Sequence, residues 1–70
     1  KSANLKSLAK INKEQAEAAA LELVEGKIEK VKLENEDGYL VYNVTVKFKG
    51  DKFEILVDAG SGKAVAVEEE

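Results

Sequence analysis

The fold is decided by residues 40–58, which read LVYNVTVKFKGDKFEILVD. Apolar and polar side chains alternate through residues 40–48 and again from Phe53 onward. This period of two is typical of β-strands that bury one face. Between the two runs lies Gly50-Asp51, which suits a two-residue hairpin loop. A loop there predicts that Phe48 lies opposite Phe53, with apolar residues paired along one face of the hairpin.

Two further turns extend this pattern into a four-stranded meander. A turn at Asp37-Gly38 adds a strand over residues 27–34 and sets Leu33 opposite Tyr42 and Val31 opposite Val44. Ile28 is out of phase with the other apolar residues of that strand, which predicts a bulge near Glu29.

The last strand is predicted over residues 63–68, after a loop at residues 60–62. Gly62 suits a left-handed bulge position, and Asp58 can accept hydrogen bonds from the backbone of the loop. This loop sets Val57 opposite Val65 and Ile55 opposite Val67, with all these side chains on the buried face.

One helix is predicted over residues 13–25, before the strands. Asn12 and Gln15 have the spacing of a capping box. Apolar residues then recur at helical spacing and predict one buried stripe, formed by Ala16, Ala19, Ala20, Leu23 and Val24. Gly26 is suited to a left-handed conformation that ends the helix.

The sequence therefore predicts an α+β fold, with one N-terminal helix packed on one face of a four-stranded antiparallel meander sheet. Residues 11–67 form a single domain. Residues 1–10 are a lead-in that is either a short helix or disordered, with Leu5 and Leu8 able to dock on the core. Residues 68–70 form an acidic tail expected to fray.

The sheet face away from the helix is expected to be mostly polar, but it carries four less polar residues. The predicted register sets Thr45 opposite Leu56 and Leu56 opposite Ala66, so that a small patch forms. This patch is our candidate partner surface, and it consists of Val41, Thr45, Leu56 and Ala66. The alternative is ordinary surface apolarity with no function.

Composition excludes several classes of function. The 70 residues include neither Cys nor His, which removes disulfides, thiolate or imidazole metal sites and the usual general base. The 11 basic residues are all Lys and are outnumbered by 14 acidic residues, for a net charge of −3. Binding to nucleic acid is therefore not expected, and no apolar run is long enough for membrane insertion.

Two motifs resemble ligand sites without meeting their requirements. Residues 60–63, GSGK, lack the first Gly and the final Ser or Thr of a phosphate-binding loop. Asn35, Asp37 and Gly38 fit part of a calcium loop, but Leu33 and Val44 stand where carboxylates are needed. We predict no catalytic, cofactor-binding or metal-ligating residue and no enzymatic activity.

The chain resembles the PepSY domain family through residues 11–67. The similar stretches are INKEQA at 11–16, GKI at 26–28, EDGYLVYNV at 36–44 and VDAGSGKAV at 57–65. PepSY domains are non-catalytic and occur in propeptides of thermolysin-like secreted metalloproteases and in other extracytoplasmic proteins. The resemblance implies an extracytoplasmic or secreted module that binds or inhibits a protein partner, such as a secreted metallopeptidase.

Two alternatives to this function remain open at the level of sequence. The first alternative is a structural or self-associating unit of a larger tandem-domain protein, or a homodimer that pairs through residues 27–34 or 63–68 or packs through the patch at Leu56. The second alternative is an engineered domain with no natural partner. It is suggested by the absence of Pro, Cys, His, Met, Trp and Arg from the sequence.

Overall fold

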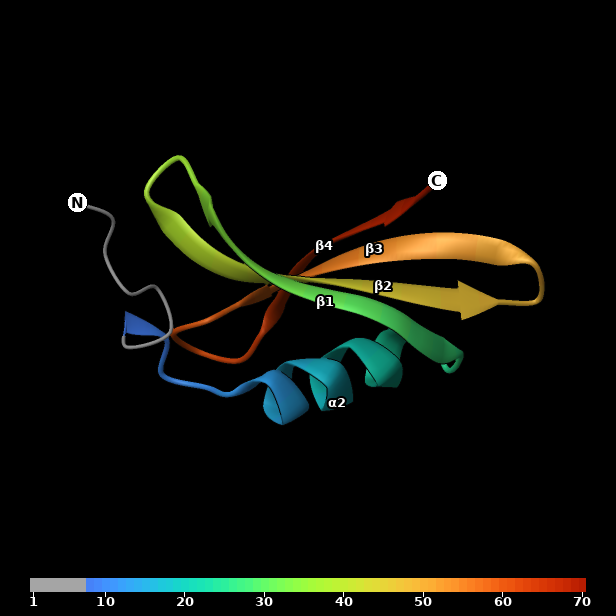
Figure 1. Cartoon of the computed structure of the whole chain (residues 1–70), viewed down its shortest axis with the longest axis horizontal. Coiled ribbons are helices and arrows are strands. Elements are labelled where there is room, and N and C mark those ends of the chain that lie inside the picture. The colour runs from blue at the N-terminus through green and yellow to red at the C-terminus, as the bar shows by residue number, and fades with distance from the viewer. Residues whose placement is uncertain (1–7) are drawn as a thin grey trace.

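The computed structural model describes residues 8–70 as one helix followed by four strands (Figure 1). The sheet is antiparallel throughout and its strand order is β1-β2-β3-β4, which confirms the predicted α+β meander. The predicted docking of Leu5 lies outside the described residues, whereas Leu8 is exposed and Ala9 packs against the core. The elements are α2 (Lys13–Leu23), β1 (Lys27–Glu36), β2 (Tyr39–Phe48), β3 (Asp51–Asp58) and β4 (Ala64–Glu69).

The helix begins as predicted and ends two residues early. The Asn12 side chain accepts a hydrogen bond from the Gln15 N–H, and the Gln15 side chain accepts one from the Asn12 N–H, each at 2.8 Å. Ala16 and Ala20 are fully buried, as expected. The prediction for Leu23 is wrong, because this side chain is 55% exposed. Helical conformation stops there, and Leu21 packs against the core instead.

Gly26 does not have the left-handed conformation that its position after the helix predicted. Positive φ angles among the glycines occur at Gly38, Gly50 and Gly62. Gly26 is instead required because β2 passes close to it. A Cβ atom at Gly26 would overlap the Lys47 carbonyl oxygen and would lie 2.9 Å from a Val46 methyl carbon.

The pairing of β1 with β2 follows the prediction. Leu33 lies opposite Tyr42 and Val31 opposite Val44, and the register shifts between Ile28 and Lys30. That shift is the bulge expected near Glu29. It allows Ile28 to face the core, where it is half-buried.

The loop between β2 and β3 lies one residue before the predicted position, which shifts the pairing of the two strands by two residues. The loop is Lys49-Gly50, with φ angles of 53° and 85°, which is the pattern of a type I′ turn. Phe48 therefore lies opposite Asp51, and Phe53 opposite Val46. A shift of two residues keeps every side chain on its predicted face, but Phe48 extends past the covered core and is 38% exposed.

The pairing of β3 with β4 is confirmed in part. Ile55 lies opposite Val67 as predicted, but Val57 lies opposite Ala64 rather than Val65, because a bulge shifts the register. Gly62 has a φ of 80°, and the Asp58 carboxylate accepts a hydrogen bond from the Gly60 N–H at 2.8 Å. The strand continues to Glu69, beyond the predicted end of the domain.

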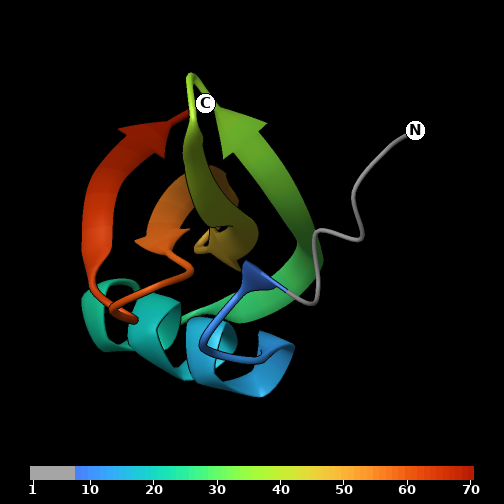
Figure 2. The ribbon, with the colours of Figure 1, turned by 90° about the vertical axis from the view of Figure 1, so that its left-hand side faces the viewer.

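The sheet is strongly twisted, and α2 packs on one face of it. Figure 2 looks down the long axis and shows β1 and β4 on either side of the central strands, each beginning near α2 and ending far from it. The main core lies between α2 and the central strands, where Val44, Val46, Ile55 and Val57 are fully buried. The opposite face of the sheet contains a hollow, described below, and we call it the concave face.

Candidate partner-binding surface

The four residues predicted as a partner surface all lie on the concave face, but they do not form an exposed patch. Val41 is 4% and Thr45 7% exposed, while Leu56 and Ala66 are half-buried. Leu56 lies opposite Ala66 as predicted, yet its neighbour on β2 is Asn43 and not Thr45. The two-residue shift in the pairing of β2 with β3 causes this difference.

A mainly apolar hollow lies at one end of the concave face. Its volume is about 320 Å³, and it is lined by Glu36, Tyr39, Val41, Leu56, Asp58 and Val65. Tyr39 is 71% and Val65 60% exposed, so these two present the accessible apolar surface, while Val41 and Leu56 lie deeper. We call this feature the concave hollow.

Little in the sequence indicates that Tyr39 and Val65 belong to this hollow. Tyr39 adjoins the turn and lies outside the alternating run that we assigned to β2. Perfect alternation in the last strand predicts Val65 on the core face. The bulge opposite Val57 breaks that alternation. Gly62, with its left-handed conformation, was the one signal of an irregular start to β4.

A polar network occupies the middle of the concave face. The Asn43 amide nitrogen lies 3.5 Å from a carboxylate oxygen of Glu34 and 3.5 Å from one of Glu54. Hydrogen bonds from Glu70 and Asn43 lower the pKa of Glu54. The Glu54 carboxylate in turn raises the pKa of Glu70, which donates to it when protonated. The hydrogen bond between these two carboxyls is the largest cause of both pKa shifts.

Charge is distributed unevenly along the concave face. Lys27, Lys47 and Lys52 lie in one row across three strands, near the β2–β3 hairpin. The Lys52 ammonium also lies 3.5 Å from the Glu29 carboxylate. At the opposite end, Glu36 and Asp58 border the concave hollow. A partner seated over this face would meet an acidic end and a basic end.

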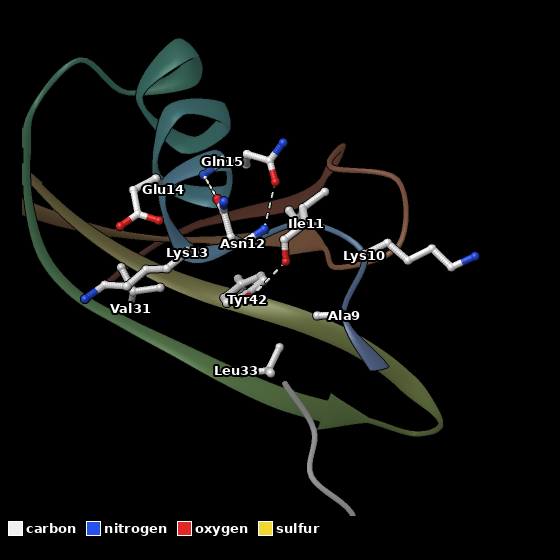
Figure 3. A pocket seen from close by; sticks show the side chains of 10 residues that line it. All are labelled: Ala9, Lys10, Ile11, Asn12, Lys13, Glu14, Gln15, Val31, Leu33 and Tyr42. Carbon is white, nitrogen blue, oxygen red and sulfur yellow. Dashed lines mark hydrogen bonds between the residues drawn. The ribbon is translucent and has the colours of Figure 1, made fainter. Parts of the chain in front are cut away.

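A second depression lies on the helix side and is shown in Figure 3. It has a volume of about 640 Å³ and lies between residues 9–15 and the β1–β2 pair. The half-buried Val31 and Leu33 form its apolar wall. The Tyr42 hydroxyl crosses from the sheet and donates a hydrogen bond to the Ile11 carbonyl oxygen at 3.2 Å. This bond ties the segment before α2 to the core.

Neither ligand-like motif adopts the conformation that its ligand requires. Residues 60–63 form a tight turn that leads into β4, in which the Ser61 hydroxyl donates to the Asp58 carboxylate at 3.2 Å. The Asn35 side chain accepts a hydrogen bond from the Gly38 N–H at 2.9 Å and so closes its own hairpin. Within residues 8–70, no group of three His, Cys, Asp or Glu side chains is arranged to hold a metal ion.

Comparison with known families identifies the domain. The PepSY family model, described as peptidase propeptide and YPEB domain, matches residues 10–68. The chain belongs to the PepSY family. Its match covers α2 and nearly all of the sheet, in agreement with the resemblance seen at residues 11–67.

A solved structure shares the fold of this PepSY domain. It is a crystal structure of a Clostridium difficile protein described as a candidate lipoprotein, with a TM-score of 0.83 and 23% sequence identity. The match covers 86% of this chain and 40% of that protein. No curated protein sequence gives a significant match. Among the described residues of this PepSY domain, no helix has the length and apolarity needed to cross a membrane.

Proposed function

We propose that this PepSY domain is a non-catalytic, extracytoplasmic module that binds and inhibits a secreted metallopeptidase. The observation that carries the proposal is the family match, which spans residues 10–68 and is described by its occurrence in peptidase propeptides. The similarity of the fold to a candidate lipoprotein supports a location outside the cytoplasm.

We assign partner binding to the concave face. Protein interfaces concentrate their binding energy in aromatic and apolar anchors set within a polar surround. Tyr39 and Val65 provide such anchors around the concave hollow, and Glu36 and Asp58 provide the polar rim. Val41 is buried and forms part of the floor of the hollow, and Thr45 is buried further along β2 on the same face. Leu56 and Ala66 complete the surface from the two strands beside it.

The experiment is a titration of the chain against purified secreted metallopeptidases, beginning with thermolysin, with the rate of peptide hydrolysis as the readout. We expect inhibition at micromolar concentration. Tyr39→Lys and Val65→Lys should each weaken it by about tenfold or more, the loss typical of an interface anchor. Leu23→Lys is the matched control, because Leu23 is 55% exposed on the helix, on the other side of the molecule.

Two results would contradict parts of the proposal. Absence of inhibition and of binding at tens of micromolar for every peptidase tried would contradict the proposal. Equal losses in the Tyr39→Lys and Leu23→Lys variants would contradict the assignment to the concave face while leaving the peptidase as partner.

A second candidate function is that of a structural unit in a larger protein. It is favoured by one observation, which is that the chain spans 40% of the length of the structurally similar protein. In that case the concave face or a sheet edge would pack against a neighbouring domain or a second copy. Sedimentation velocity tests the homodimer version, and the surrounding gene tests the tandem version and an engineered origin.

A further inference from the structure

The two edges of the sheet are protected to very different degrees. β1 carries six charged residues among its ten, and a bulge interrupts it after Ile28. Charges and bulges are the usual devices that keep an edge strand from pairing with another chain. The first four residues of β4 are Ala64, Val65, Ala66 and Val67, none of which is charged. β4 is thus the edge that is less protected against pairing with another chain.

The backbone hydrogen bonds show which groups of β4 point outward. The Glu70 N–H donates to the Lys52 carbonyl oxygen at 2.8 Å, so the groups of Glu70 point toward β3. In an antiparallel ladder, successive residues point their N–H and C=O groups to opposite sides. Glu68 and Ala66 therefore also bond to β3, whereas Glu69 and Val67 present free groups along the outer edge.

The side chains along this edge favour pairing with an additional strand. Val67 is 47% exposed on the helix side, because α2 packs mainly over β2 and β3. Val65 is 60% exposed beside the concave hollow. A strand added to β4 would cover apolar surface on both faces of the sheet while it satisfies the outward backbone groups.

Charge decides what kind of strand fits. The edge ends in Glu68, Glu69 and Glu70, and Lys63 is the one basic residue in residues 63–70. A second copy of the chain would set three carboxylates against at most one ammonium group per strand. The geometry points to an extended segment of the partner protein, with β-branched or small side chains and Lys or Arg residues beside Glu68–Glu70, which adds to β4 as a fifth strand.

This inference rests on the proposed function only in that the segment belongs to the bound partner. The same fifth strand would place its side chains next to Val65, so that the outer edge of β4 and the concave hollow form one continuous surface. The test uses a synthetic peptide and therefore does not depend on the identity of the peptidase.

The experiment is amide hydrogen exchange measured by NMR on the 70-residue chain. The probe is the capped peptide Lys-Lys-Val-Thr-Val-Thr, together with the version that carries the two Lys residues at its other end. We expect protection of the Val67 and Glu69 amides to rise at least about tenfold at saturation. The Ala66 and Glu68 amides, already bonded to β3, should change little. This alternating pattern is specific to strand addition.

Two variants sharpen the test. Val67→Pro removes an outward N–H without breaking a bond to β3, and edge strands tolerate Pro at such positions. It should weaken peptide binding by at least about fivefold, whereas Val67→Thr should not. Neutralising Glu68 and Glu69 with Gln should weaken binding by about threefold for each carboxylate that meets a Lys.

Three results would contradict the addition of a partner strand to β4. No protection at millimolar peptide, or equal binding of a Glu-Glu-Val-Thr-Val-Thr peptide, would overturn the inference. Protection of Val67 and Glu69 that depends on chain concentration without peptide would show that a second copy is the occupant, and would also overturn it. Inhibition of a peptidase that is unchanged in Val67→Pro would leave the proposed function standing without this strand.

Discussion

The close approach of β2 to Gly26 makes Gly26→Ala the most informative substitution for the fold. The added Cβ would overlap the Lys47 carbonyl oxygen and press against a Val46 methyl carbon at 2.9 Å. Backbone atoms cannot move aside as the end of a flexible side chain can, so the start of β1 must shift away from β2. Such overpacking typically costs about 1–3 kcal/mol.

The expected change in stability is large for so small a domain. A loss of about 2 kcal/mol corresponds to a fall in Tm of about 8–16 °C at this chain length. The assay is urea denaturation and thermal unfolding, each followed by circular dichroism. We expect a lower midpoint with an unchanged m-value, since the unfolded state is little affected.

Gly60→Ala is the matched control, because it also adds one methyl group at a glycine without positive φ. Its nearest neighbour would be a terminal carboxylate oxygen of Asp58 at 3.4 Å, which can yield. We expect a change within about 0.5 kcal/mol, typical of an unstrained surface substitution. If Gly26→Ala is as stable as Gly60→Ala, then β2 does not pass where the structure places it.

Three further outcomes follow from local contacts, each with its own readout. Asn12→Ala should destabilise the chain by about 1 kcal/mol in urea, because it breaks the capping box with Gln15; Asn12→Asp or Asn12→Ser should retain most of the stability. Leu23→Ala should cost less than about 0.5 kcal/mol by the same method, since the side chain is 55% exposed, and a loss above about 2 kcal/mol would show that Leu23 is part of the core. Glu54 raises the pKa of Glu70, so stability from the Glu70 proton is full below the ordinary pKa of 4.5 and is lost as pH rises through the folded value. Glu70→Gln should therefore be more stable than the parent chain at pH 7, with a difference that shrinks toward pH 4; an opposite trend would refute the contact with Glu54.

The order of elements and the faces of the strands could be predicted because they follow from period and turn residues. Asp37-Gly38 marked its hairpin correctly, and the phase of Ile28 revealed the bulge in β1. These signals are local, so one sequence contains them. The capping residues of α2 are local in the same way.

The errors concern features that depend on neighbouring chain segments. The predicted loop differs by one residue from the observed loop at Lys49-Gly50, because either dipeptide that contains Gly50 fits a two-residue loop. Packing of Phe53 against the core selects one of them. The position of Gly26 after the helix predicts a left-handed conformation, whereas the actual reason for a glycine there is the proximity of β2. The burial of Val41 and Thr45 on the face without a helix leaves no signal in the periodicity.

The candidate surface was predicted only in part. Its face was correct, and Leu56 and Ala66 are neighbours as expected. The accessible residues Tyr39 and Val65 were missed, because one adjoins a turn and the other adjoins a bulge. Residues at such irregular positions are where sequence periodicity carries least information.

The most direct test of the account is NMR mapping of the chain in complex with an inhibited secreted metallopeptidase. We predict that the amides of Tyr39, Val65 and Val67 are perturbed together, along the concave hollow and the outer edge of β4. Signals from α2 should remain unaffected. Perturbations confined to α2, or the absence of a complex with any such peptidase, would contradict the account.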